Sequence, residues 1–471
     1  MSGIAELLAN LGFVVTGSDA RRSAVTARLE SAFGVTVAEG HRADNVGDAD
    51  VVVFTSAARA DNPELVEARA RGIPVVPRAE MLAELMRLKR GIAVAGSHGK
   101  TTTTSMIAWV LERGGLDPTA VIGGRLSAFG SNARLGRGEF MVAEADESDR
   151  SFLMLSPSIA VMTNIDHEHM ESYRDFAELQ GAFAEFANTV PFYGAAIACA
   201  DDAPLAAMLP MVRRRLVTYG LDSAQAQITA TGVELGAFGG RCIVHRTNPG
   251  GSTRLGELTL AVPGRHNLQN ALAAVAVAGE VGLDFPVVAS ALAEFQGAER
   301  RFERCGEAGG VLVVDDYGHH PTEIAAVLAA ARVTLGRRLV VVFQPHRYSR
   351  TRDLLHAFGP ALTGADDVVL TDIYAAGEEP IPGVTAEVLA ASIERAGPRV
   401  RLVKTLDQII PAVLALVRPG DAVITLGAGS IGTMPARILD ALRGEGGPVP
   451  PTLRGSEGGP VPPKLRRSEG R

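Results

Sequence analysis

The sequence predicts an α/β protein with three domains in series, and three observations carry this prediction. Short apolar strands alternate with helical segments along most of the chain, which is typical of parallel, doubly wound sheets. A strand, a loop of small polar residues with one lysine, and a helix follow one another over residues 91–113. The chain has 471 residues, 46% of them hydrophobic, which is enough to fill about three domain cores.

The first domain is expected over residues 1–88. Residues 1–6 already have the pattern of a helix, and residues 78–88, "RAEMLAELMRL", predict another. The expected strands are "FVVTGSD" (13–19), which ends in an acid, "ADVVVFTSA" (49–57), which is expected to be buried, and "GIPVVP" (72–77).

A second domain is expected over residues 89–304 and a third over 305–443. The second contains the strand and loop at 91–103, a β-rich stretch at 215–247 and an alanine-rich helix at 266–282. Its further strands are expected at 139–146 and 158–166, and those of the third domain at 311–315, 339–343, 368–372 and 422–426, with helices between them.

The last segment, 444–471, has a different composition. "GGPVPPTLRGSE" (446–457) is followed directly by "GGPVPPKLRRSE" (458–469), so the repeat has a period of 12 residues rich in Pro and Gly. Such a segment cannot bury enough apolar surface to fold, and we expect a disordered tail.

Composition excludes several classes of partner. The formal net charge of −7 argues against nucleic acid, which favours basic faces. We expect no membrane association, because no apolar run reaches about 20 residues, and a cytoplasmic location, because no signal peptide is evident. Cys199, Cys242 and Cys305 lie far apart, so we expect buried thiols and neither disulfides nor a zinc site.

The loop in "VAGSHGKTTTT" has the composition of a phosphate-binding loop. Gly96 and Gly99 would let backbone amides approach phosphate oxygens, Lys100 would reach the β- and γ-phosphates, and the Thr101 hydroxyl would bind magnesium. The match to the full motif is imperfect, because Val94 occupies the place of the first glycine. An ordinary glycine-containing turn between strand and helix is the alternative.

Acidic residues follow two predicted strands of the same domain. "AEADESD" places Glu144, Asp146, Glu147 and Asp149 after one strand, and "TNIDHEHMES" places Asn164, Asp166, His167, Glu168 and His169 after another. The carboxyl ends of parallel strands face the ligand crevice of an open sheet. Magnesium bound to phosphates takes one or two carboxylates, and a second metal can take a histidine. Solvated loop charges are the alternative.

Three further segments carry candidate ligand-binding side chains. His266 and Asn270 are four residues apart on one helical face, where an amide can bond both edges of an adenine; a helix cap is the alternative. "VVDDYGHHPTE" and "FQPHRYSRTRD" end two predicted strands with acids, histidines and arginines. Clustered arginines suit a carboxylate or a phosphate, and a salt-bridged surface loop is the alternative. The glycine-rich turn "TLGAGSIG" (425–432) is weak evidence by itself.

Taken together, "GSHGKTTTT", "EADESD", "TNIDHEHM", "PGRHNLQNALAA", "VDDYGHHPTE" and "FQPHRYSRTRD" make a pattern that resembles the Mur ligases, the ATP-dependent amide ligases of peptidoglycan synthesis. The resemblance covers residues 1 to about 443. It implies a Rossmann-like, doubly wound N-terminal domain for a UDP-sugar, a central P-loop ATPase domain, and a Rossmann-like C-terminal domain for the incoming amino acid.

The resemblance also implies a reaction. ATP phosphorylates a carboxylate, an amine attacks the acyl phosphate, and ADP and phosphate are released. "FQPHRYSRT" is most similar to the branch that adds L-alanine to UDP-N-acetylmuramate, which names the expected partners. The branch that attaches a whole tripeptide to the same sugar stays open, as do a nicotinamide-dependent oxidoreductase and a non-catalytic nucleotide-binding regulator. We expect a monomer or a weak homodimer.

The resemblance assigns candidate residues to each role. The catalytic set is Lys100, His169, Arg301, His319 and His346, and the Mg²⁺ set is Thr101, Glu144 and His169. The ATP set is Gly96, Ser97, His98, Gly99, Lys100, Thr101, Thr102, His266, Asn270, Arg301 and Asp316, in which Asp316 binds the ribose. The substrate set is Ser18, Asp19, Ser56, Tyr317, His319, Arg347 and Arg350.

Three departures from the family pattern carry expectations. A strand and a glycine-rich loop normally precede "MSGIAE", so we expect either a misplaced start or impaired UDP binding. Glu168 replaces the usual aspartate before His169, which would shift a second metal slightly. No lysine lies between Lys100 and Lys404 that could be carboxylated to bridge the metals, as in several related ligases; the alanine-adding branch also lacks it.

Overall fold

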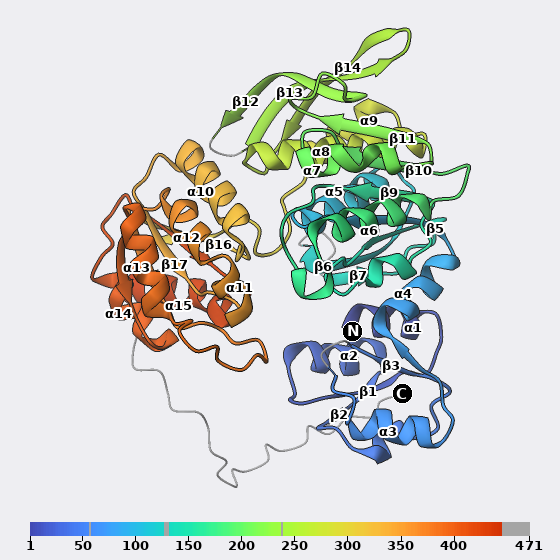
Figure 1. Cartoon of the computed structure of the whole chain (residues 1–471), viewed down its shortest axis with the longest axis horizontal. Coiled ribbons are helices and arrows are strands. Elements are labelled where there is room, and N and C mark those ends of the chain that lie inside the picture. Colours follow the sequence, from blue (N-terminus) through green and yellow to red (C-terminus); the bar gives the residue numbers. More distant parts are fainter. Residues whose placement is uncertain (56–57, 127–130, 237–238, 445–471) are drawn as a thin grey trace, which may run out of the picture.

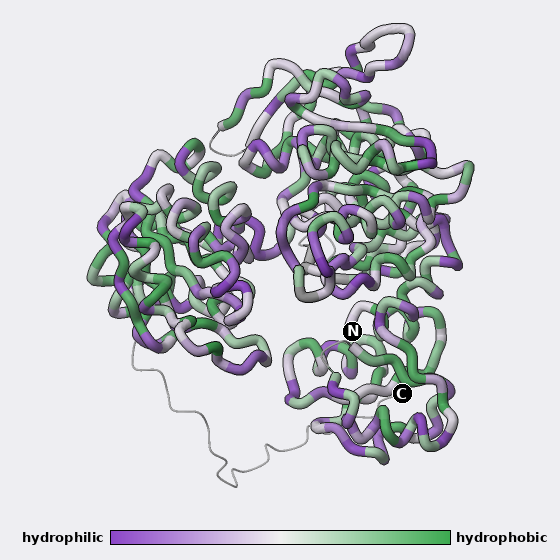
Figure 2. The backbone as a smooth tube through the Cα atoms, viewed as in Figure 1, coloured by the Kyte–Doolittle hydropathy of each residue, from purple (hydrophilic) through white to green (hydrophobic). Residues whose placement is uncertain are grey.

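A computed structural model describes residues 1–55, 58–126, 131–236 and 239–444 (Figure 1). The described chain forms an N-terminal unit, a central unit and a C-terminal unit, each built around its own strands. Hydrophobic stretches run through the interior of these units, and hydrophilic stretches lie mostly in their loops and outer helices (Figure 2). The repeat at 446–471 lies outside the described residues.

The N-terminal unit contains short parallel strand pairs. β1 (Thr16–Asp19) pairs with β2 (Thr36–Glu39), and β3 (Val52–Phe54) pairs with β4 (Val75–Pro77). Among the described residues the two pairs do not join into one sheet, so the alternation of strands and helices is confirmed, whereas a continuous sheet is not formed. The helical elements are α1 (Ser2–Asn10), α2 (Ala24–Phe33), η1 (Ala43–Val46), α3 (Pro63–Ala70) and α4 (Arg78–Arg87).

All three strand predictions for this unit were too long. The strand expected at 13–19 begins only at Thr16, because Phe13 and Val14 are exposed and Val14 has 97% of its surface accessible. Of the strand expected at 49–57, the described residues form only β3, which is half-buried and not buried, and 56–57 lie outside them. The strand expected at 72–77 begins only at Val75. The reason is the same in each case: a strand with a single short partner covers little apolar surface.

The central unit is built on a large mixed sheet with the order β14-β13-β12-β11-β10-β9-β5-β8-β6-β7. The strands from β12 to β6 are parallel, and antiparallel strands extend the sheet at both ends. Its strands are β5 (Arg90–Ala95), β6 (Thr119–Leu126), β7 (Ser131–Arg134), β8 (Phe140–Glu144), β9 (Ile159–Met162), β10 (Ala195–Cys199), β11 (Leu216–Gly220), β12 (Ile228–Gly236), β13 (Gly239–Asn248) and β14 (Gly251–Leu260).

The helices of the central unit cover this sheet, and the alanine-rich helix lies deepest. On α8 (Arg265–Glu280) every residue from Ala271 to Ala278 is buried, because small side chains let it pack closely against α5 (Lys100–Arg113). The other helical elements are η2 (Ser151–Met154), η3 (Met170–Ser172), α6 (Phe176–Asn188), α7 (Ala203–Met208), η4 (Leu209–Met211) and α9 (Phe285–Ala293).

The C-terminal unit is a second doubly wound sheet with the order β15-β16-β20-β17-β18-β19. Only β15 runs antiparallel to its neighbour among the described strands of this sheet. The strands are β15 (Glu303–Ala308), β16 (Val311–Asp316), β17 (Leu339–Phe343), β18 (Asp367–Leu370), β19 (Arg399–Leu402) and β20 (Ala422–Leu426). The helices are α10 (Pro321–Leu335), α11 (Tyr348–Asp353), α12 (Leu355–Leu362), α13 (Ala386–Ala396), α14 (Ile409–Leu414) and α15 (Met434–Arg443), with η5 (Leu406–Gln408) and η6 (Ser430–Thr433).

The cysteines are free, as expected, but they are not equally buried. Cys199 and Cys242 are buried, whereas Cys305 is only half-buried, which corrects the expectation for that residue. Burial raises the pKa of all three thiols, to about 12 for Cys199 and Cys305 and about 11 for Cys242. Within the part of the chain that the structure describes, no helix is long and apolar enough to cross a membrane.

Candidate active site

The predicted phosphate loop lies between β5 and α5, and its glycines are required by geometry. Gly96 has a φ of +141°, and a Cβ atom placed on it would come within 1.9 Å of the Thr163 Oγ1 atom. Gly99, with a φ of +81°, is the N-cap residue of α5. Glycine adopts these conformations without the strain that other residues would suffer. The absence of a side chain lets the loop lie directly against the end of β9. The loop also forms the N-terminus of α5, where backbone N–H groups attract anions.

Lys100 is buried in the loop and ion-paired. Its Nζ atom donates to the carbonyl of Gly96 at 2.6 Å and to the Glu147 carboxylate at 2.7 Å. Burial lowers the pKa of Lys100, but the charges of Glu147 and Asp146 outweigh burial and raise the pKa above its ordinary value. Lys100 is therefore a fixed cation, and an anion entering the loop would compete with Glu147 for it.

The candidate magnesium ligands come from three segments: Thr101 from α5, Glu144 from the end of β8 and His169 from the segment after β9. The Thr101 hydroxyl donates to Glu144 at 3.3 Å, and Glu144 also accepts a hydrogen bond of 2.6 Å from the backbone N–H of Gly123. Burial raises the pKa of Glu144. His169 lies on the other acidic segment, with a φ of +57° and its Nε2 atom 4.0 Å from a Glu168 oxygen. Thr101 and Glu144 are thus in contact, and their oxygens are the donor type that Mg²⁺ prefers.

The acidic segment after β9 holds the loop in place. The Asn164 side chain accepts from the backbone N–H of His98 at 2.8 Å and donates to the carbonyl of the same residue at 3.0 Å. The Thr163 hydroxyl donates to that carbonyl at 2.6 Å, and Ser97 accepts through its hydroxyl from the Asp166 backbone at 2.8 Å. These bonds fix the backbone of Ser97 and His98, so the loop keeps its shape without a ligand.

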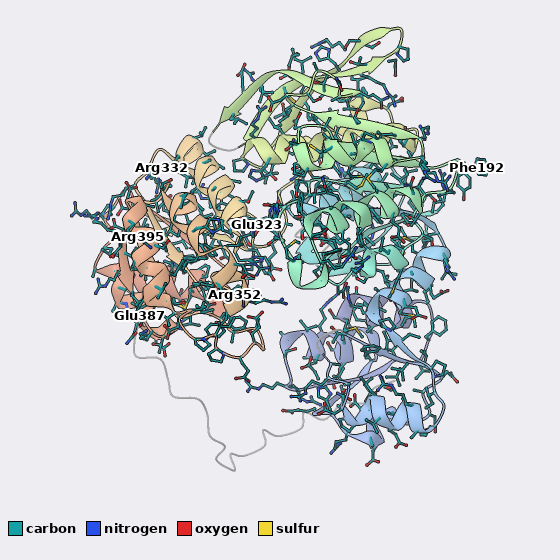
Figure 3. The ribbon with its side chains drawn as sticks, in the orientation of Figure 1. Phe192, Glu323, Arg332, Arg352, Glu387 and Arg395 are labelled. Atoms are coloured by element: carbon teal, nitrogen blue, oxygen red, sulfur yellow. The ribbon has the colours of Figure 1, made fainter. Side chains whose placement is uncertain are left out.

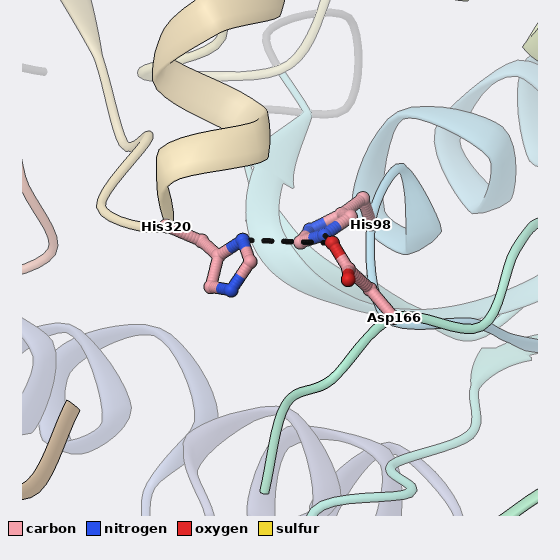
Figure 4. A group of neighbouring side chains, drawn as sticks. All are labelled: His98, Asp166 and His320. Carbon is pink, nitrogen blue, oxygen red and sulfur yellow. Dashed lines mark hydrogen bonds and ion pairs between the residues drawn. The ribbon is translucent and has the colours of Figure 1, made fainter. Parts of the chain in front are cut away.

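His98, Asp166 and His320 bring the central and C-terminal units together (Figure 4). Asp166 accepts hydrogen bonds from His98 Nε2 at 2.9 Å and from the Thr322 hydroxyl at 2.7 Å. Nitrogen and oxygen atoms of the three side chains lie within 4.8 Å of one another, a spacing compatible with a metal site.

An ion-pair network describes this cluster better than a metal site. Burial lowers the pKa of His98, but the hydrogen bond to Asp166 and the nearby carboxylates of Glu323 and Glu168 raise the pKa to about 10. The hydrogen bond from His98 holds the pKa of the Asp166 carboxyl well below its usual range. With this pKa His98 keeps its proton and hydrogen-bonds to Asp166, and an imidazole binds a metal only after losing that proton.

The candidate adenine residues lie beside the loop on α8. The Asn270 side-chain oxygen is 3.0 Å from the position that a Cβ atom on Gly99 would take. His266 is half-buried near Arg301, and its partial burial lowers its pKa to about 4. The structure therefore places a neutral imidazole and an amide next to the phosphate loop.

Arg301, Asp316 and Tyr317 lie at the junction between the central and C-terminal units. The guanidinium groups of Arg300 and Arg301 lie 5.2 and 5.3 Å from the centre of the Tyr317 ring. Asp316 accepts backbone hydrogen bonds from Phe302 at 2.7 Å and Gly318 at 2.6 Å, and burial raises its pKa to about 6. Asp316 therefore has a structural role in this junction, whatever ligand it binds.

The remaining C-terminal candidates form one group. The rings of His319 and His346 meet edge-on at 5.4 Å, and the pKa of each is lowered by burial, to about 4 and about 3. Arg350 donates toward His346 at 3.1 Å and lies 3.7 Å from Glu168 of the central unit. Arg347, with a φ of +71°, begins α11.

The structure does not bring the N-terminal candidates to the loop. Ser18 and Asp19 end β1 in the N-terminal unit, where the Ser18 hydroxyl donates to Glu64 at 2.7 Å. Ser56 lies outside the described residues. A site that used Ser18 and Asp19 would bind a part of the substrate remote from the phosphate loop.

Sequence reasoning missed Glu323. It named Asn164, Glu147 and Asp166 only as members of acidic motifs that could bind metal, and it did not predict their contacts with the phosphate loop. Glu323 follows Pro321 by two residues, a pattern that predicts a helix cap, but nothing in the sequence places it against another domain. Asn164 and Glu147 belong to acidic motifs that directly follow predicted strands. Their position at the ends of these strands was the sequence signal that placed them near the site.

Comparison with known families covers nearly the whole chain. The Mur ligase family catalytic domain matches residues 1–90, the Mur ligase middle domain matches residues 94–278, and the Mur ligase glutamate ligase domain matches residues 300–429.

Similar proteins include a UDP-N-acetylmuramate–L-alanine ligase of Geobacter sp. (strain M21), 55% identical over 92% of this chain and 93% of the relative. One from Anaeromyxobacter sp. (strain Fw109-5) is 54% identical over the same shares. Among solved structures, UDP-N-acetylmuramate-alanine ligase of Thermotoga maritima has 30% identity and a TM-score of 0.80, covering 95% of this chain and 97% of that one. A murein peptide ligase of Psychrobacter arcticus 273-4 has 26% identity and a TM-score of 0.69, covering 94% and 96%.

Proposed function

The chain belongs to the Mur ligase family, and from this premise we propose how its residues carry out the reaction. The chain joins L-alanine to the carboxylate of UDP-N-acetylmuramate in peptidoglycan biosynthesis. We propose that the carboxylate is first activated as an acyl phosphate with release of ADP, and that the amine of L-alanine then displaces phosphate.

ATP with Mg²⁺ fits the residues of the phosphate loop. A Cβ atom on Gly96 or Gly99 would be strained or would meet a neighbour, so these positions have no side chain to cover their amides against an anion. Lys100 supplies a fixed positive charge. Thr101 and Glu144 supply oxygen donors for the magnesium ion. When bound, ATP and Mg²⁺ supply the phosphoryl group and neutralise its charge. We assign His266 and Asn270 to the adenine, Asp316 to the ribose and Arg301 to the phosphates.

The cationic groups overcome a repulsion in the reaction. A substrate carboxylate and a triphosphate are both anions, so they approach each other only where positive charge lies between them. Lys100 comes from the central unit and Arg301 from the junction with the C-terminal unit, and both stay charged despite burial. We propose that these two cations and His169 surround the transferred group.

The group around His346 fits an amino acid. Arg347 and Arg350 carry the charge that a carboxylate requires. Burial lowers the pKa of His319 and His346, which favours the neutral imidazole in each. Nδ1 of His346 accepts from Arg350, whereas His319 donates through Nδ1 to the Tyr317 carbonyl and has Nε2 as its acceptor. We propose that the arginines bind the carboxylate of L-alanine and that the imidazoles, with Tyr317, line the space around its amine.

The resulting division of labour follows the units of the fold. We propose that residues 1–88 bind the UDP-sugar with Ser18, Asp19 and Ser56, that 89–304 bind ATP, and that 305–443 bind the amino acid. The observation that carries the assignment is a pair of contacts at the carboxyl ends of β5 and β8, Lys100 with Glu147 and Thr101 with Glu144, in a chain of this family.

A phosphate-release assay tests the proposal. The full chain is incubated with UDP-N-acetylmuramate, ATP, Mg²⁺ and, separately, L-alanine, glycine, L-serine or the tripeptide. We expect release to depend on all components and to be fastest with L-alanine. Release that is fastest with the tripeptide would assign the chain to the recycling branch, and release without any amine would contradict ligation.

A further inference from the structure

Glu323 has a capping role that any helix of this kind could use. It is the third residue of α10, and its carboxylate accepts from the backbone N–H groups of His319 at 3.1 Å and His320 at 3.4 Å. Pro321 occupies the first turn, where its missing N–H costs nothing. This pairing is a capping box, and a neutral glutamine would also satisfy it.

The same carboxylate contacts groups from two other parts of the site. A Glu323 oxygen lies 3.7 Å from His98 Nδ1 in the phosphate loop and 3.5 Å from Arg301 Nη1 at the junction between units. The other oxygen lies 3.5 Å from His319 Nδ1. Glu323 thus lies on the side of the C-terminal unit that faces the central unit, whereas Glu387 lies on its far side (Figure 3).

The contacts of Glu323 with His98, Arg301 and His319 all depend on its carboxylate being negatively charged. Burial raises its pKa, but the facing groups of His319, His98 and Arg301 outweigh burial and hold the pKa well below its ordinary value. His98 and Arg301 are cations that face Glu323. Asp166 and Glu168 are further anions beside His98, and Arg350 lies against Glu168. Removing one charge alone from this half-buried network leaves its partners uncompensated.

We propose that Glu323 is a positioning residue that links the amino-acid unit to the ATP loop by orienting His98 and Arg301. The proposal rests on the function proposed above. Since His98 belongs to the central unit and Glu323 to the C-terminal unit, the contact forms only when the two units are together. Phosphoryl transfer then takes place with the loop and Arg301 held in one arrangement, and with the amino-acid unit in place to supply the amine.

The test uses the full chain and the variants Glu323→Gln, Glu323→Asp and Glu387→Gln. Glutamine keeps the capping oxygen and removes the charge, whereas aspartate keeps the charge. Glu387 is the matched control, because it also lies in the first turn of a C-terminal helix and pairs with an exposed lysine on the far side. We expect Glu323→Gln to lower kcat by about 10- to 100-fold, with the KM for L-alanine nearly unchanged.

The other variants separate positioning from capping. Glu323→Asp should lose less than Glu323→Gln, and Glu387→Gln should match the parent chain. The melting temperature of Glu323→Gln should stay within about 2 °C of the parent, since the cap is kept. Full activity of Glu323→Gln would overturn the proposal. Equal losses in kcat and melting temperature for both Glu323 variants would also overturn it, because they would indicate capping alone.

A double-mutant cycle tests whether Glu323 acts through the loop. In a His98→Asn background, Glu323→Gln should cost at least about 3-fold less in kcat than in the parent chain, because His98 is already gone and the contact with Arg301 remains. Losses that multiply in the double variant would show that the two residues act independently and would refute the link. The parent chain is first assayed for L-alanine-dependent ADP release, so that a failure of the proposed function is seen before any variant is compared.

Discussion

At the scale of single residues, Lys100 is the group on which phosphoryl transfer depends most directly. Its ammonium is fixed by Gly96 and Glu147 and stays charged. We predict that Lys100→Ala lowers kcat at least about 100-fold, because one charge is lost beside the transition state. Lys404→Ala is the control, since Lys404 is exposed and pairs with Glu387. Near-normal phosphate release by a folded Lys100→Ala chain would remove Lys100 from the mechanism.

His98 should give the protein a pH-dependent stability. The pKa of His98 in the folded chain is about 10, above its ordinary value of 6.5, so the folded state binds the proton more tightly than the unfolded state. Its contribution is therefore complete below pH 6.5 and is lost as the pH rises toward 10. We predict that the melting temperature of the parent chain falls more between pH 7 and 9.5 than that of the His98→Asn variant. Parallel curves for the two chains would contradict an imidazolium at this position.

The sequence located most candidate residues but not the bonds among them. Gly96, Gly99 and Lys100 were predictable, because a short local pattern requires their conformations and charge. The pairing of Lys100 with Glu147 and of His98 with Glu323 joins residues 47 and more than 200 positions apart, and no local pattern encodes it. Such contacts depend on how sheets and units meet.

At the scale of elements, the phosphate loop depends on the end of β9. We predict that Gly96→Ala destabilises the chain and weakens binding of an ATP analogue at least about 10-fold. The conformation at φ +141° costs of order 1–3 kcal/mol for alanine, and the added methyl would also displace Thr163, whose hydroxyl bonds the His98 carbonyl. Calorimetric titration and thermal unfolding measure the two effects.

A control separates strain from collision in that experiment. Gly115 also has a positive φ, +76°, but a Cβ atom there would meet nothing within 4 Å. Gly115→Ala should therefore cost only backbone strain and leave nucleotide binding unchanged. If the two variants lose stability and affinity equally, the contact with Thr163 does not shape the loop.

Element prediction succeeded best where strands are buried on both faces. β5, β17 and β20 are apolar runs inside large sheets, and each was located closely, whereas β9 has only four of the nine residues expected at 158–166. β1 and β3 were predicted too long, because their apolar residues have no covering layer and a single neighbour. An apolar run thus predicts a strand's existence better than its length or burial.

At the scale of the whole molecule, the three units do not have equal cores. One large cluster fills the central unit and includes Ile4 and Leu7 of α1, so that helix is held by its neighbour. The strands of the N-terminal unit rest on a small cluster formed by Leu29, Val35 and Val37. Stability scales with the apolar area that folding buries, so the N-terminal unit has the least to hold it.

This difference predicts the order in which the units open. In native-state hydrogen exchange, amides of β1, β2 and α2 should exchange through openings of lower free energy than amides of β5, β8 and β9. Under the proposed division of labour, UDP-N-acetylmuramate should slow exchange in β1 and β2. At 100 times its Kd it should raise the free energy of opening there by about 2.7 kcal/mol. An ATP analogue should instead protect the start of α5. Uniform exchange across the units would contradict the ranking of the cores. Protection of β1 and β2 by the ATP analogue alone would contradict the placement of the sugar site.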